Sequence, residues 1–153
     1  MKKTYCITDP CYILPDTTWS ECISYADKTS KEDNVDWSEI FNKAVDMALT
    51  KFTQGRTWVN STLFGDWDNV MYGPNVIQDE FCADSGMVAV CSFNDKVQEA
   101  LKDCPKHCYA VIEIEDNVSV EFDESVSDWC VVKITSSNGD IFHSEYPIEE
   151  DEN

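Results

Sequence analysis

Apolar and polar side chains alternate along residues 109–123, and this pattern limits the fold more than any other feature of the chain. Two successive runs, 111–115 and 118–123, place apolar residues on one side and mostly acidic residues on the other. A period of two with one charged side is typical of an antiparallel sheet that has one face in water. We therefore expect these two runs to form adjacent strands with their acids pointing outward.

A second periodic segment predicts the main helix, over residues 36–53. Asp36 precedes the segment and Glu39 follows three residues later, which is the pattern of a capping box. Seven apolar residues then recur at helical spacing: Ile40, Phe41, Ala44, Val45, Ala48, Leu49 and Phe52. A helix with one apolar face is typical of a helix that packs on a sheet.

Shorter signals supply the remaining elements. Asp16 is expected to cap a short helix, and residues 28–34 are expected to form a polar linker. Asn94 or Asp95 begins another short helix. The Asn-Gly pair at 138–139 predicts a hairpin turn between two strands.

These signals together predict an α+β fold. We expect a twisted, mainly antiparallel β-sheet with one longer helix, at about 36–53, and one or two short helices packed on it. The length of 153 residues fits one domain, which we place at 1–148, followed by an acidic tail at 149–153.

Negative charge is concentrated at the C-terminal end of the sequence. Thirteen Asp or Glu residues and a single base, Lys133, lie between Val111 and Asn153, so this segment carries −12 of the chain's net charge of −19. A field of this sign repels nucleic acid and anionic lipid and attracts basic protein surfaces. Charge therefore predicts a basic protein as the partner, with no direct nucleic acid and no membrane.

No apolar run is long enough for a signal peptide or a membrane span. We therefore expect a cytoplasmic protein, in which the eight cysteines are reduced.

Six acids of the C-terminal segment are the expected partner-binding residues: Glu113, Glu115, Glu121, Asp123, Glu124 and Asp128. Their carboxylates would stand in for DNA phosphates against Lys and Arg side chains of the partner. An acidic surface that serves only solubility is the alternative interpretation.

Four aspartates in turn-like motifs are the second candidate site: Asp9, Asp66, Asp68 and Asp84. Carboxylates that converge can bind a hard cation or act as an acid–base pair. Aspartate beside Pro, Gly or Ser also commonly fixes a turn by accepting backbone hydrogen bonds. An enzyme or a small-ligand or metal-binding pocket built on these residues is therefore the alternative function.

The segment 104–108 looks superficially like a zinc knuckle, because Cys104, His107 and Cys108 supply three possible ligands. A fourth would have to come from Cys82, Cys91 or Cys130. The spacing matches no paired Cys-x-x-Cys pattern, so ordinary buried cysteines are favoured. We expect no metal, no cofactor and no catalytic residue.

Three short motifs in this order resemble a family of small phage and bacterial proteins. They are Asp9-Pro-Cys-Tyr12, the segment 61–66 that ends in Gly-Asp, and the segment 83–90 that begins Ala-Asp-Ser-Gly. The resemblance covers about residues 5–93. Trp67 replaces the second glycine of the family's Gly-Asp-Gly turn, and a helix is inserted between the first two motifs. The resemblance implies the fold and a phage context, hence the cytoplasm of a host cell, but no activity.

Charge and context together predict an acidic phage-type binding protein rather than an enzyme. We expect it to inhibit a bacterial defence nuclease, as anti-CRISPR or anti-restriction proteins do, by acting as a DNA mimic on a basic nucleic-acid-binding surface.

Overall fold

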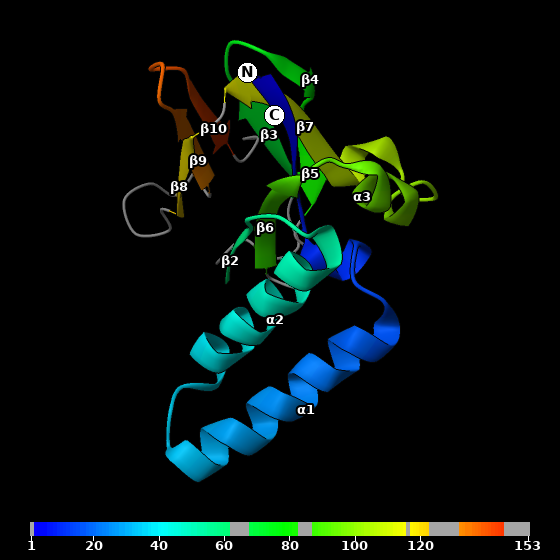
Figure 1. Cartoon of the computed structure of the whole chain (residues 1–153), viewed down its shortest axis with the longest axis vertical. Helices are drawn as coiled ribbons and strands as arrows, with labels where there is room; N and C mark the ends of the chain where they lie inside the picture. The colour runs from blue at the N-terminus through cyan, green and yellow to red at the C-terminus, as the bar shows by residue number, and fades with distance from the viewer. Residues whose placement is uncertain (1, 62–67, 83–86, 116, 123–131, 146–153) are drawn as a thin grey trace, which may run out of the picture.

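The computed structural model describes residues 2–61, 68–82, 87–115, 117–122 and 132–145. Within these residues, two antiparallel sheets and a group of helices form three layers (Figure 1). The α+β class and the mainly antiparallel pairing are therefore confirmed. The strands form two stacked sheets, however, where the sequence suggested one.

Sheet A is the middle layer, and its strand order is β2-β6-β1-β7-β4. The strands are Trp58–Ser61 (β2), Met87–Ser92 (β6), Lys2–Thr8 (β1), Tyr109–Glu115 (β7) and Val76–Gln78 (β4). The first five residues of β6, Met-Val-Ala-Val-Cys, are all buried. A strand with a packed layer on each face needs apolar residues at every position, not at alternate ones.

Sheet B is an outer layer, with the order β5-β3-β10-β9-β8. Its strands are Glu80–Cys82 (β5), Asp68–Tyr72 (β3), Ile141–Glu145 (β10), Val132–Ser136 (β9) and Val118–Phe122 (β8). Buried residues alternate with more exposed ones along β8, β9 and β10. Sheet B therefore has one buried face and one open face.

The space between the sheets holds one apolar core. Ile7 and Ile112 of sheet A pack in the same cluster as Phe81, Ile134 and Phe142 of sheet B, and each is at most 1% exposed. Burial of one such side chain contributes roughly 1.5–3 kcal/mol. This core fixes the two sheets against each other and holds the open face of sheet B in place.

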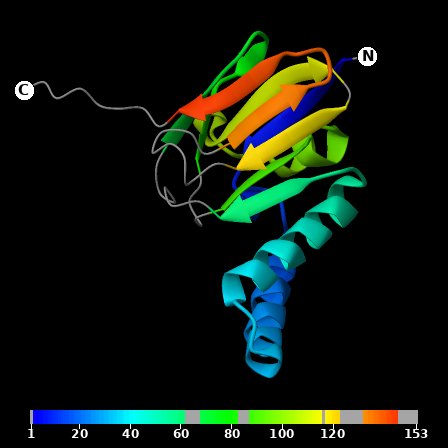
Figure 2. The same ribbon diagram turned by 90° about the vertical axis from the view of Figure 1, so that its left-hand side faces the viewer.

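Helices pack on the other face of sheet A, chiefly through α2. The helices are α1 (Asp16–Asp33), α2 (Trp37–Thr53) and α3 (Asp95–Ala100), with the 3-10 helix η1 (Pro10–Tyr12); a second 3-10 helix, η2 (Lys106–Cys108), contacts β5 and β7. Val45 and Leu49 of α2 are fully buried in a cluster with Ala89 and Cys91 of sheet A. α1 packs chiefly along α2, and the two form a hairpin that extends away from the sheets (Figures 1 and 2).

The predicted main helix is confirmed as α2. The Asp36 carboxylate accepts a hydrogen bond from the Glu39 N–H at 3.1 Å, as expected for the cap. At the other end, Gln54 adopts a left-handed conformation and donates its N–H to the Thr50 carbonyl at 2.8 Å. The expected β9–β10 hairpin is also present, and Gly139 takes the positive φ that its turn requires.

The prediction for α1 was wrong in two respects. α1 continues through the expected linker as far as Asp33, and Asn34 leaves the helix with φ 56°. The linker sequence is polar but contains neither Gly nor Pro, so it can form the solvent-facing end of a helix. Pro15, rather than Asp16, is the N-cap residue, and Asp16 lies in the first turn, where its charge suits the helix dipole.

Candidate interaction surface

The open face of sheet B is the most extended uncovered surface of the strands that the structure describes. Along β8, β9 and β10 its residues alternate with those of the core between the sheets, whereas at the β5 edge η2 contacts the sheet. Figure 2 shows β8, β9 and β10 side by side on this face, away from the helices. We call this surface the outer face of sheet B, and its principal side chains are Tyr72, Glu80, Glu121, Lys133, Ile141, His143 and Glu145.

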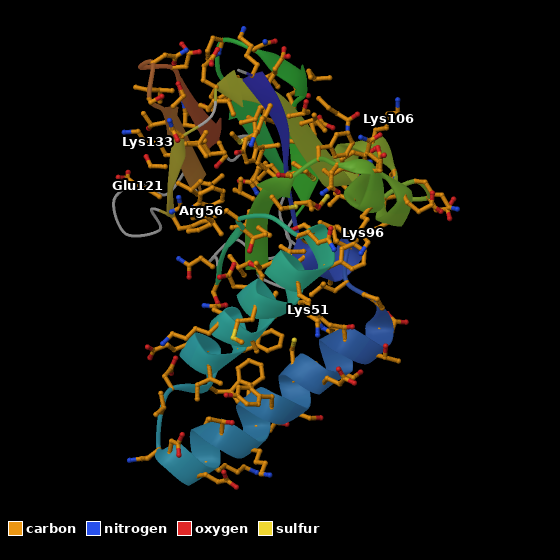
Figure 3. The ribbon with its side chains drawn as sticks, viewed as in Figure 1. Lys51, Arg56, Lys96, Lys106, Glu121 and Lys133 are labelled. Atoms are coloured by element: carbon orange, nitrogen blue, oxygen red, sulfur yellow. The ribbon has the colours of Figure 1, made fainter. Side chains whose placement is uncertain are left out.

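Among the described side chains, three exposed carboxylates lie on this outer face, on three different strands: Glu80 on β5, Glu121 on β8 and Glu145 on β10. Lys133 lies directly opposite Glu121 on the neighbouring strand β9 (Figure 3). Opposite charges in this position stabilise a strand pair only slightly, by roughly 0.2–1 kcal/mol. Glu121 therefore remains accessible to a stronger partner such as a guanidinium group.

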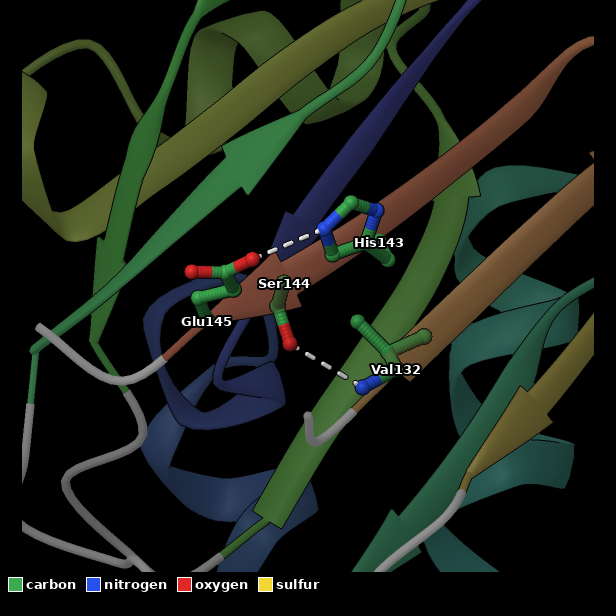
Figure 4. A network of polar contacts seen from close by, with 4 residues as sticks. All are labelled: Val132, His143, Ser144 and Glu145. Carbon is green, nitrogen blue, oxygen red and sulfur yellow. Dashed lines mark hydrogen bonds and ion pairs between the residues drawn. The ribbon is translucent and has the colours of Figure 1, made fainter. Parts of the chain in front are cut away.

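A short polar network fixes the middle of the outer face. The His143 Nε2 and Glu145 Oε2 atoms lie 3.0 Å apart (Figure 4). The His143 ring stacks on Tyr72 at a centroid distance of 5.7 Å. On the buried side of the same strand, the Ser144 hydroxyl accepts a hydrogen bond from the Val132 N–H at 3.1 Å. The positions of β9 and β10 are thus held from both faces.

Apolar side chains accompany the charges on this surface. Tyr72 is 47% exposed and Ile141 is 48% exposed. Exposed aromatic residues serve as anchors in many protein interfaces, although single apolar residues are also common on ordinary surfaces.

The predicted six-acid patch is only partly located on this face. Of its described members, Glu121 is on sheet B, but Glu113 and Glu115 are on β7 of sheet A. The Glu113 Oε1 accepts a hydrogen bond from the Asn75 side chain at 2.8 Å, and Glu115 lies opposite Lys2. The expectation that the two acidic runs form adjacent strands was therefore wrong.

The chain crosses from one sheet to the other between these two runs, next to Asn117, which has φ 62°. Ile112 and Ile114 of β7 and Val118 of β8 belong to the same core cluster, so the two strands face each other across the sandwich. Alternation shows which side of each strand is apolar. It does not show whether two strands are hydrogen-bonded neighbours or stacked layers.

Asp123, Glu124 and Asp128 lie outside the described residues. Their place in the chain is still informative, because the segment that carries them joins β8 to β9, two neighbouring strands of sheet B. The residues after β10 include four further acids of the C-terminal tail. The acidic C-terminal segments are thus connected to the ends of the strands that form the outer face.

Of the four aspartates in the alternative pocket, only Asp9 has a side chain that the structure describes. Asp9 is fully buried, and its Oδ1 accepts a hydrogen bond from the Cys11 N–H at 2.9 Å at the start of η1. This confirms the turn-capping interpretation for Asp9. Asp66 and Asp84 lie outside the described residues. The backbone of Asp68 is in β3, opposite Cys82 of β5.

A hollow of about 470 Å³ lies on the helical side of the molecule. It is lined by Leu14, Pro15, Thr18, Glu21, Ala48, Lys51, Phe52 and Lys96. The Lys96 ammonium lies 5.2 Å from the centre of the Phe52 ring, and Figure 3 shows Lys51 and Lys96 on this side, far from Glu121. No pattern in the sequence predicts this hollow, because its lining comes from three helices and the turn before α1.

Comparison with protein-family profiles, with curated protein sequences and with solved structures finds no match to this chain. Among the described residues, none of the helices combines the length and the apolar character that a membrane crossing requires.

Proposed function

We propose that this protein binds a basic protein surface through the outer face of sheet B. The observation that carries the proposal is topological: β8, β9 and β10, all from the acidic C-terminal third, are hydrogen-bonded neighbours in sheet B, and Glu121 and Glu145 are exposed on its outer face. Glu80 from β5 adds a further carboxylate to the same face. The proposal keeps Glu121 from the predicted patch and adds Glu80 and Glu145.

Charge supports a cationic partner over any other class. The net charge is −19, so nucleic acid and anionic lipid are repelled, whereas Arg and Lys side chains are attracted. Carboxylates accept paired, charge-assisted hydrogen bonds from guanidinium groups, which is the contact that a phosphate makes in a nucleic-acid groove. Tyr72 and Ile141 would add an apolar contact that phosphates cannot supply.

The outer face of sheet B is smaller than the area that one partner usually contributes to a protein interface. Five strands about 4.8 Å apart, with about five residues of roughly 3.3 Å each, give a face of roughly 400 Å². A standard interface takes about 800 Å² from each partner. A contact of standard size would therefore extend beyond this face.

A defence nuclease is the partner class that we propose within this charge class. Such an enzyme has a basic groove for nucleic acid, and the phage-type motifs Asp9–Tyr12 and 83–86 provide the context in which its inhibition is useful. Occupation of that groove would block nucleic-acid binding by competition. Competition of this kind weakens steeply with salt, because it depends on the same charges as the nucleic acid.

The test compares two triple variants of equal net charge. One removes the acids of the outer face, Glu80→Gln, Glu121→Gln and Glu145→Gln; the control removes three exposed helical acids, Glu21→Gln, Glu32→Gln and Glu39→Gln. Tagged proteins are used to capture bacterial lysate proteins at graded salt, and candidate nucleases are then purified and assayed for DNA binding in competition with each variant.

The proposal predicts that wild type and the helical variant capture the same nucleic-acid-binding protein and displace its DNA. The outer-face variant should lose at least about tenfold in affinity, or 1.4 kcal/mol. An equal loss of affinity in both variants would mean that binding depends on net charge alone. Equal binding by all three proteins would show that the outer face of sheet B is not the contact surface.

A further inference from the structure

Two cysteines and a histidine converge where the two sheets meet, outside the surface described above. Cys82 ends β5 of sheet B, whereas His107 and Cys108 belong to η2, the turn that leads into β7 of sheet A. The ligand atoms of the three residues all lie within 4.8 Å of one another, and the two sulfur atoms are 3.9 Å apart. The sequence offered Cys82 as one of three possible additions to the 104–108 segment.

We propose that Cys82, His107 and Cys108 bind a zinc ion. Zinc takes tetrahedral sets of thiolate and imidazole ligands at about 2.3 Å for sulfur, which places two sulfur ligands about 3.8 Å apart. The observed sulfur–sulfur distance of 3.9 Å matches this value. A disulfide needs about 2.05 Å, so the two thiols are positioned as a ligand pair rather than as a bond.

The surroundings of η2 hold these ligands in place. The Thr8 hydroxyl donates to the Cys108 carbonyl at 2.7 Å, and the Gln78 side-chain amide donates to the carbonyls of Lys106 and Tyr109 at 2.9 and 2.6 Å. Backbone atoms on both sides of His107 and Cys108 are thus bonded to β1 and to the end of β4. A site whose ligands are positioned before metal arrives loses little conformational entropy on binding.

The exposure of His107 gives the metal an entry path. Cys82 and Cys108 are each 7% exposed, while His107 is exposed. The two thiols therefore lie on the protein side and the imidazole on the solvent side, and a fourth ligand would have to come from outside these three residues. Three protein ligands with one open position are the arrangement found in zinc sites that carry an exchangeable ligand.

The ion would connect the two sheets at this end of the molecule. β5 belongs to sheet B and β7 to sheet A, and the described contacts between β5 and η2 already join them here. Zinc binds the thiolate form of cysteine, so uptake of the ion should release protons to the solvent. Soft thiolate ligands also favour zinc over magnesium or calcium, which prefer oxygen.

The first experiment is titration of the purified, fully reduced full-length chain with Zn²⁺ against a chromophoric chelator, and with Co²⁺ as a spectroscopic substitute. We expect one ion per chain, with thiolate-to-cobalt charge-transfer absorption and the strong ligand-field bands of a tetrahedral site. Zinc should also raise the melting temperature by a few degrees, because it binds only the folded chain. Failure of the reduced protein to bind either ion overturns the proposal.

The variants separate the site from folding effects. Cys82→Ser and Cys108→Ser should abolish binding. Since both positions are buried, the decisive variant is His107→Gln, which changes an exposed side chain and should lower zinc affinity at least about tenfold. Cys22→Ala, on α1, is the matched control and should bind like wild type.

Unchanged affinity in His107→Gln, or loss of binding in the Cys22→Ala control, contradicts the assignment of ligands. Mass spectrometry of protein purified in air provides a further check. If Cys82 and Cys108 are joined there as a disulfide and the reduced protein takes up no zinc, the two residues are a redox pair and not a metal site.

Discussion

Sheet A and sheet B have the same number of strands and the same antiparallel pairing, but only sheet B has a face in water. Sheet A lies between the core cluster that it shares with sheet B and the helical layer, and the first five residues of its strand β6 are all buried. Sheet B alternates buried and exposed positions along β8 to β10. The number of covered faces therefore decides where this chain can carry charge, and four predictions test that difference.

The largest effect is expected from a charge placed in each sheet. Ala89 of β6 is fully buried on the face of sheet A that packs on the helices, whereas Thr135 of β9 is only half-buried on the outer face of sheet B. Ala89→Glu should cost several kcal/mol, because it buries a carboxylate without a partner, and this is comparable to the whole stability of a domain. Thr135→Glu should change stability by less than about 0.5 kcal/mol.

Urea unfolding followed by circular dichroism measures both variants. Similar unfolding midpoints for the two would show that the helical face of sheet A tolerates charge, and the contrast between the sheets would be lost.

The second prediction concerns the two faces of sheet B. Ile134 on β9 is 1% exposed, and Ile141 on the neighbouring strand β10 is 48% exposed. Ile134→Ala should lower the free energy of unfolding by about 2–5 kcal/mol, because it leaves a cavity between the sheets. Ile141→Ala should lower it by less than about 0.5 kcal/mol. Equal losses, measured by chemical denaturation, would mean that the outer face is covered in solution.

The third prediction uses one glycine near each sheet. A methyl group added at Gly73, after β3, would overlap the buried ring of Phe142, whereas one added at Gly55 would lie 3.6 Å from the Ser92 hydroxyl oxygen, an ordinary contact. Gly73→Ala should therefore cost about 1–3 kcal/mol. Gly55→Ala should be neutral or slightly stabilising, because it restricts the unfolded chain. Thermal unfolding of both variants checks this, and a stable Gly73→Ala protein would mean that the Phe142 ring can move aside.

The smallest effect is expected from pH. Cys6 of β1 is fully buried, and burial raises the pKa of its thiol well above the ordinary value, with further increases from a hydrogen bond with Cys91 and from the charges of Cys91 and Cys104. The folded protein keeps this proton at a pH at which the unfolded chain has lost it. The protonated Cys6 thiol therefore makes its whole contribution to the free energy of unfolding below about pH 8.5. Above that pH the contribution falls, by roughly 1 kcal/mol over the first pH unit.

Urea unfolding between pH 7 and pH 10 measures this decline, and Cys6→Ala should make it shallower. An identical decline in wild type and variant would assign the effect to other groups.

Local patterns in the sequence predicted much of this fold. The carboxylate of Asp36 and the apolar positions of α2 identify a helix from neighbouring residues alone, and Asn138-Gly139 identifies its turn in the same way. The expected end of α1 failed because polarity was taken as a linker signal, although no residue before Asn34 breaks the helix.

The candidate site could not be predicted from neighbouring residues, because it depends on which distant strands pair with one another. Whether Glu113 and Glu121 share a surface depends on which sheet each strand joins, and strand pairing is set by the packing of distant residues. The convergence of Cys82 with His107 depends in the same way on β5 lying against η2, 25 residues away along the chain. Spacing rules detect metal sites within one segment and miss those assembled from two.

The central position of β1 has a consequence for synthesis. This strand pairs with β6 and β7, which follow it by about 80 and 100 residues. The centre of sheet A therefore cannot form until those residues have left the ribosome. At a synthesis rate of about 5–20 residues per second, the apolar side chains of Tyr5–Ile7 remain unpaired for several seconds. During that interval the nascent chain depends on the ribosome surface and on chaperones to keep this segment from joining the wrong strand.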